Sequence, residues 1–165
     1  MGIGNPLNGD DAAGVVALQR LRKVLRRRGA TEEGISGDAS SFFHGRIVLI
    51  EANQAPENFT GLLRQISPQI VFLIDAAWMD CAPGTICVIP WQEMGGFSAS
   101  THVQPPSMFA CYLTEQIGCQ VFTLGIQPQS LEFGSPLTLP VQRSVNRLVR
   151  ELSRSFSGNN VISQG

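Results

Sequence analysis

Four short runs of mostly apolar residues constrain the fold of this chain more than any other feature. They occupy residues 47–51, 70–75, 85–90 and 120–126, and the first two end in the carboxylates Glu51 and Asp75. Longer helical or loop segments separate them. Short, continuously apolar strands that alternate with helices are typical of a largely parallel sheet with both faces covered. We therefore expect an α/β fold.

Between these runs the apolar residues follow helical spacing. The first helix is predicted to begin near residue 11, because apolar or small residues then recur every three or four positions, at Gly14, Leu18, Leu21 and Leu25. Further helices are expected at residues 57–66, 106–117 and 140–156. The last of these carries its apolar residues on one face, which indicates packing against the sheet.

The length of 165 residues suits a single domain with its own core. We place this domain at residues 1–156 and expect residues 157–165 to form a flexible tail. Two segments with several glycine and serine residues are predicted loops, at residues 29–45 and 94–104.

The charge composition gives no reason to expect nucleic acid or a membrane as a partner. Twelve basic and thirteen acidic residues give a formal net charge of −1, and no apolar run is long enough to span a bilayer. Six basic residues lie between Arg20 and Arg28, which indicates a solvated helix end; a phosphate-binding or partner-docking patch is the alternative. No signal peptide is visible, so we expect a cytoplasmic protein with reduced cysteines, namely Cys81, Cys87, Cys111 and Cys119.

Residues 2–14 combine turn-forming residues with an acidic pair at the start of the first helix. The dipeptides Asn5-Pro6 and Asn8-Gly9 favour tight turns. We predict Asp10 as the N-cap and Asp11 as the first helical residue, where a negative charge meets the positive end of the helix dipole. By itself, an acidic pair in this position is most often only a helix cap.

Three carboxylates are expected at one edge of the sheet. Glu51 and Asp75 end two strands and Asp11 follows the turn after another, and the carboxyl ends of parallel strands meet at the same edge. His102, in a predicted loop, would join Asp11 and Asp75 as ligands of an ion such as Zn²⁺ or Ni²⁺. Taken alone, a loop histidine is more often an ordinary surface residue, and we interpret His44 in that way.

The motifs of several other enzyme classes are absent from the sequence. The glycine turn does not match Gly-x-Gly-x-x-Gly, because Leu7 stands at the third glycine position. No P-loop, Gly-x-Ser-x-Gly elbow or His-Glu-x-x-His motif occurs. A thiol nucleophile, Cys81 or Cys111 with His102 as its base, is an alternative, although the surroundings of both cysteines favour packing.

Five short motifs occur in order along nearly the whole chain. They are Gly4-Asn5 with Asp10-Asp11 and Gly14, Ala55-Pro-Glu-Asn58, Ile74-Asp75-Ala76, Thr101-His102 and Leu124-Gly-Ile-Gln-Pro128. None is specific alone, but the ordered set resembles the hydrogenase maturation endopeptidases. These enzymes trim the C-terminal extension from the large subunit of nickel-containing hydrogenases, and the chain is most similar to the type that serves hydrogenase 3.

The resemblance implies a three-layer α/β/α fold, with a mostly parallel sheet of about five strands. It also implies a metal site whose ligands correspond to Asp11, Asp75 and His102, with Asp11 and Asp75 as catalytic residues. Nickel carried by the substrate would be the recognition signal, and zinc or another divalent ion is an alternative in the isolated protein. Glu51 corresponds to the carboxylate linked to substrate discrimination, so it is the expected substrate-binding residue.

The sequence departs from the family in two places. Glu51-Ala52-Asn53 stands where the family usually has Asp followed by two glycines, which changes the local loop. Only Met1-Gly2-Ile3 precede the glycine turn, where the family has a full strand. We therefore expect the first strand to be truncated or its start misassigned, and we expect a truncated chain to be unstable or inactive.

The predicted function is that of a monomeric endopeptidase acting on a nickel-loaded hydrogenase large-subunit precursor. The alternative from another class is a non-catalytic checkpoint protein that binds nickel or the precursor without cutting it. A third alternative is a nucleotide-binding α/β domain that uses the glycine turn. Cleavage of the precursor separates the first two, and a melting temperature raised by ATP or NAD would support the third.

Overall fold

The computed structural model describes residues 1–36, 38–43, 46–90 and 106–158. Its strands are β1 Gly2–Ile3, β2 Glu32–Ser36, β3 Ala39–Phe42, β4 Ile47–Asn53, β5 Ile70–Ala76, β6 Ile86–Ile89 and β7 Gln120–Ile126. These strands form one sheet in the order β2-β3-β4-β1-β5-β7-β6.

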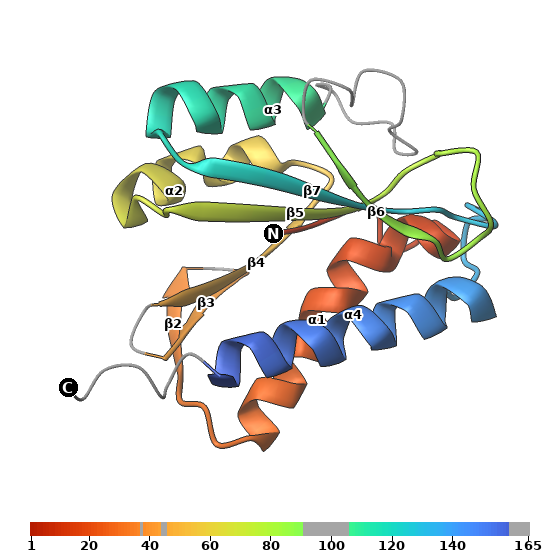
Figure 1. Cartoon of the computed structure of the whole chain (residues 1–165), viewed down its shortest axis with the longest axis horizontal. Coiled ribbons are helices and arrows are strands. Elements are labelled where there is room, and N and C mark those ends of the chain that lie inside the picture. The colour runs from red at the N-terminus through yellow and green to blue at the C-terminus, as the bar shows by residue number, and fades with distance from the viewer. Residues whose placement is uncertain (37, 44–45, 91–105, 159–165) are drawn as a thin grey trace.

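Helices cover both faces of this sheet (Figure 1). They are α1 Ala13–Arg27, α2 Thr60–Ile66, α3 Pro106–Tyr112 and α4 Leu139–Gly158, with the short helical turns η1 Gly9–Ala12, η2 Pro56–Phe59 and η4 Leu113–Ile117. Helices α1 and α4 lie side by side on one face, and α2 and α3 lie on the other. The predicted three-layer α/β/α fold is therefore confirmed. None of the described helices is long and apolar enough to cross a bilayer.

The sheet is larger and less uniformly parallel than the sequence predicts. Its centre, β4-β1-β5-β7, is parallel, whereas the β2-β3 hairpin beside β4 and strand β6 beside β7 run antiparallel. The described residues thus form seven strands instead of about five. The hairpin falls in residues 29–45, which the sequence predicts to be a loop. Its serine and glycine residues carry no strand pattern, and pairing with β4 supplies the stability that local propensity lacks.

Strand β1 holds the central position in the sheet with only two residues. Gly2 pairs with Glu51 on β4 and with Ile74 on β5. The α-amino group of Met1 donates a hydrogen bond of 2.6 Å to the Phe72 carbonyl, and burial lowers the pKa of this amine from 8.0 to about 5. The expected shortness of the first strand is confirmed, and the expectations of a misassigned start and of instability stay predictions.

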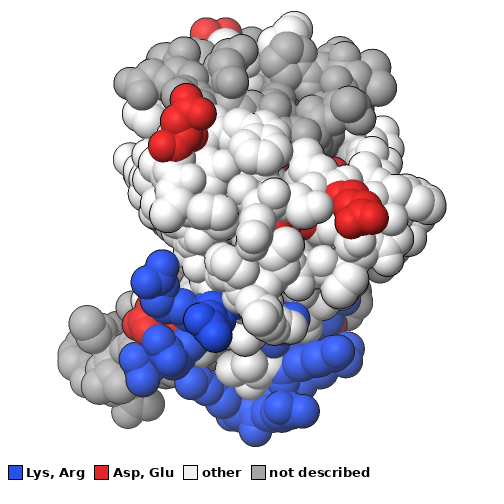
Figure 2. All heavy atoms as spheres, turned by 90° about the vertical axis from the view of Figure 1, so that its right-hand side faces the viewer, with Lys and Arg blue, Asp and Glu red and all other residues white. Residues whose placement is uncertain are grey.

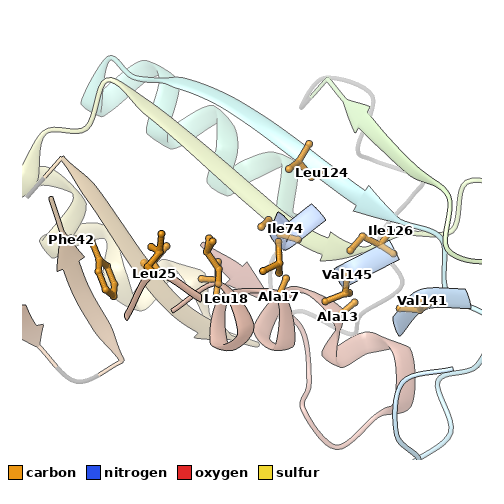
Figure 3. Close-up of a cluster of buried hydrophobic side chains, with 13 residues drawn as sticks. Ala13, Ala17, Leu18, Leu25, Phe42, Ile74, Leu124, Ile126, Val141 and Val145 are labelled. Carbon is orange, nitrogen blue, oxygen red and sulfur yellow. The ribbon is translucent and has the colours of Figure 1, made fainter. Parts of the chain in front are cut away.

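The predicted apolar faces of the first and last helices form the core on one side of the sheet. Leu18, Leu21 and Leu25 of α1 pack with residues of α4, namely Val141, Val145 and Val149, and with strand residues such as Ile74 and Ile126 (Figure 3). All of these side chains are buried. Each contributes about 1.5–3 kcal/mol to stability through its burial, so this layer fixes α1 against the central strands.

Two glycines let the start of α1 lie directly on the sheet backbone. A Cβ atom at Gly14 would lie 2.1 Å from the Ile74 carbonyl oxygen and 2.4 Å from that of Ile3. Gly4 has a φ of +123°, and a Cβ there would lie 1.8 Å from the carbonyl oxygen of Asp11. The turn before α1 is therefore held against the carboxyl ends of β1 and β5.

We predict that Gly14→Ala destabilises the protein by at least about 3 kcal/mol, because the new methyl group overlaps two carbonyl oxygens that belong to packed strands. Gly61→Ala in α2 is the matched control. A Cβ at Gly61 meets nothing within 4 Å, so this change should stabilise by about 0.4–1 kcal/mol. Urea unfolding of both variants measures the difference, and equal midpoints would contradict the packing described here.

Candidate functional site

Asp11 and Asp75 lie at the same edge of the sheet, beyond the carboxyl ends of the central strands. Asp11 belongs to η1, which packs against β5, and Asp75 is the penultimate residue of β5. Both residues are buried, with exposed fractions of 2% and 3%. The structure therefore brings together two of the three carboxylates predicted to meet there.

Backbone N–H groups orient both carboxylates. The amide of Asn5, in the glycine turn, donates a hydrogen bond of 2.9 Å to Oδ2 of Asp11. The amide of Ala76 donates one of 2.8 Å to Oδ1 of Asp75. Burial of a carboxylate is costly unless hydrogen bonds replace its lost water, and these bonds meet part of that need while fixing where the oxygens lie.

Asp10 has a structural role that the sequence did not predict. It was expected to cap the first helix, but neither η1 nor α1 has a side-chain N-cap hydrogen bond. Its buried carboxylate instead accepts four hydrogen bonds of 2.7–3.1 Å, from the backbone N–H groups of Gln129, Ser130 and Thr138 and from the Thr138 hydroxyl. Asp10 thus ties the turn before α1 to the loop between β7 and α4.

Gln127, also buried, holds the loop that follows β5. Its Oε1 atom accepts hydrogen bonds from the amides of Met79 at 2.7 Å and Cys81 at 3.4 Å. This loop begins directly after Asp75 and Ala76. Gln127 belongs to one of the motifs noted in the sequence, but no function was predicted for it, because its partners lie 46 and 48 residues away along the chain.

The sequence predicted Glu51 as the last residue of a strand. This prediction is wrong, because β4 continues to Asn53. The carboxylate of Glu51 is held against α1, by an ion pair of 2.6 Å with Nη1 of Arg22 and a hydrogen bond of 3.0 Å from Nε2 of Gln19. The position of this side chain is set by Arg22 and Gln19 of α1, which lie 29 and 32 residues earlier in the chain and give no local signal near Glu51. The substrate-binding role of Glu51 stays a prediction.

The predicted third ligand, His102, lies outside the described residues, as do His44 and the loop 94–104. Within the described ranges, no group of three or more His, Cys, Asp or Glu side chains is arranged to hold a metal ion. Asp11 and Asp75 offer oxygen ligands that suit a divalent ion. The structure thus describes two of the three predicted ligands, and the metal-binding role of the set stays a prediction.

The cysteines do not favour a thiol mechanism. All four are free thiols. Burial, together with a hydrogen bond to Glu115 and its negative charge, raises the pKa of Cys111. A raised pKa leaves less of the nucleophilic thiolate at neutral pH, which favours the packing role predicted for this residue.

We predict that Asp10→Asn destabilises the protein by about 2–4 kcal/mol, because an amide nitrogen replaces an oxygen that faces hydrogen-bond donors. Asp38→Asn, at an exposed position, is the control and should change stability by less than about 0.5 kcal/mol. Thermal melting gives both values. Hydrogen exchange should also show loss of protection in residues 127–138 of the Asp10 variant, and wild-type protection there would contradict the role assigned to Asp10.

Comparison with known proteins identifies the family. The sequence matches the hydrogenase maturation protease (HycI) family model over residues 34–155. A putative hydrogenase maturation protease of Methanocaldococcus jannaschii is 34% identical over 153 residues, which cover 92% of this chain and 83% of the relative. The hydrogenase 3 maturation protease of Escherichia coli K12 is 28% identical over 163 residues, 98% of this chain and 92% of the relative. The crystal structure of the [NiFe] hydrogenase maturation protease HycI from Thermococcus kodakarensis aligns with a TM-score of 0.72 at 25% identity, over 93% of this chain and 87% of that one. The chain therefore belongs to the hydrogenase maturation protease family.

Proposed function

We propose that this protein is an endopeptidase that removes the C-terminal extension of a hydrogenase large-subunit precursor, and that nickel carried by the precursor is its recognition signal. Membership of the maturation protease family supports the reaction class. A monomer acting in the cytoplasm is part of the same proposal.

The observation that carries the proposal is the pair of buried carboxylates at one sheet edge. Asp11 and Asp75 come from separate elements, and a backbone N–H group fixes each of them. Both side chains are nearly completely buried, so each carboxylate has lost most of its water and depends on the protein for hydrogen bonds. In a mostly parallel sheet, the carboxyl ends of the strands are also where ligands bind.

In the proposed reaction, Asp11, Asp75 and His102 complete the coordination of the nickel that the precursor carries. This binding places the scissile peptide beside the carboxylates. A water molecule, activated by the ion or by a carboxylate of the pair, attacks the carbonyl carbon and gives a proton to that carboxylate. The C–N bond then breaks, and the proton goes to the leaving amine. The products are a new C-terminal carboxylate and the released peptide.

The test is incubation of the protein with a nickel-loaded large-subunit precursor, followed by intact mass spectrometry. We expect loss of a C-terminal peptide by the wild type. Asp11→Asn, Asp75→Asn and His102→Ala should each slow cleavage by at least about 100-fold, because each removes a ligand or base. Asp38→Asn, which alters an exposed carboxylate, should cleave as the wild type does.

Folding and function are separated by the melting temperature of each variant. A site variant that melts within a few degrees of the wild type but does not cleave supports the proposed roles. Normal cleavage by both Asp11→Asn and His102→Ala would contradict them. Binding of the precursor by the wild type without any cleavage would indicate the non-catalytic checkpoint protein instead.

A further inference from the structure

The positive charge of this protein is concentrated on helices α1 and α4. These helices, with Arg28 at the end of α1, contain ten of the twelve basic residues and only one acidic residue, Glu151. Their net charge is therefore +9, whereas the rest of the chain, with two basic and twelve acidic residues, has −10. In the view of Figure 2 the Lys and Arg side chains gather at the lower end of the molecule. A net charge of −1 conceals this separation.

Five of these ten basic residues line a groove between the two helices. Because α1 and α4 pack side by side, a groove with a volume of about 350 Å³ forms between them. Its polar lining includes Arg20, Lys23 and Arg27 from α1, Arg28 directly after α1, and Asn146 and Arg150 from α4. We call the basic residues of both helices, together with this groove, the α1/α4 basic face.

Internal carboxylates neutralise only part of this face. Arg22 and Arg26 pair with Glu32, and Glu151 is shared by Arg150 and Arg154. In the described part of the chain, Lys23, Arg27, Arg143 and Arg147 have no carboxylate within ion-pair distance. Like charges on neighbouring helices repel, so this surface costs stability in the isolated protein and attracts an anionic partner.

The extent of the face fits a protein surface better than a single phosphate or single-stranded nucleic acid. A single phosphate would contact a few of the ten cations, which extend along both helices from Arg20 to Arg154. Single-stranded nucleic acid is normally bound with aromatic side chains on which bases stack. The only aromatic residue of α1 and α4 is Phe156, which packs against the core. An acidic protein segment needs no such platform.

The same helices connect the basic face to the candidate site. Helix α1 begins two residues after Asp11, and α4 begins next to Thr138, which binds Asp10. At 1.5 Å per helical residue, the basic end of α1 lies about 14 to about 26 Å from Asp11. A folded domain of about 100 residues has a radius of gyration of about 13 Å, so a precursor domain that places its cleavage site at the Asp11 edge spans this distance.

We propose that the α1/α4 basic face is a docking site for an acidic segment of the precursor, separate from the segment that is cut. This inference rests on the proposed function. It assigns binding energy to contacts remote from the scissile bond, and such contacts increase the rate of encounter and lower KM without altering the chemical step.

Charge reversal at matched positions tests the docking site. Arg27→Glu changes an exposed arginine in the last turn of α1, and Arg64→Glu changes one in the last turn of α2, on the opposite face of the sheet. We expect Arg27→Glu to raise KM for the nickel-loaded precursor about fivefold with kcat unchanged, and to weaken the dependence of KM on salt. Arg64→Glu should behave as the wild type. Lys23→Glu should reproduce the Arg27→Glu effect.

Binding of a nickel-free precursor, which the proposed recognition leaves uncut, to the wild type and to Arg27→Glu gives a readout that needs no cleavage. If the wild type cleaves the precursor, and Arg27→Glu and Arg64→Glu have the same KM and the same dependence of KM on salt, the docking site is overturned. The proposed function is then left intact. Absence of both binding and cleavage in the wild type would overturn both proposals. Tighter binding of single-stranded DNA than of precursor, abolished by Arg27→Glu, would assign the face to another partner and also overturn the inference.

Discussion

The close approach of helix α1 to the central strands is the contact on which the candidate site depends. Gly14 has no Cβ, so the first turn of α1 rests on the carbonyl groups of Ile3 and Ile74. This contact places Asp11 beside the end of β5, where Asp75 lies. Asp10, one residue earlier, fixes the same turn to the loop that leads into α4. Two adjacent aspartates thus have separate tasks: one organises the loops, and the other faces the proposed chemistry.

The elements that the sequence predicted well are those whose signal is local. The continuous apolar runs of β5 and β7 and the periodic apolar faces of α1 and α4 determine their own structure, because burial of those side chains dominates. The β2-β3 hairpin escaped prediction, because its stability comes from pairing with β4. The role of Asp10 escaped for the same reason, since its partners lie 119 to 128 residues away. The edge position of Asp11 and Asp75 was predictable, because both follow or end strands of a largely parallel sheet, whose carboxyl ends meet at one edge.

The charge distribution gives helices α1 and α4 a second proposed role. Their N-terminal ends adjoin the buried carboxylates, and their outer surfaces carry most of the positive charge of the chain. Apolar packing between α1, α4 and the sheet holds these like-charged surfaces together despite their repulsion. A protease that acts on one folded protein benefits from such an arrangement, because specificity then need not come from the scissile segment alone.

We propose that Asp11 and Asp75 form the edge of the sheet that recognises the metal. The most direct measurement is a crystal structure of the protein grown with excess Ni²⁺, with anomalous differences recorded at the nickel absorption edge. We expect one ion bound by carboxylate oxygens of both residues, with His102 as a further ligand. An ion held only at other residues, or no ion at this edge, would contradict it.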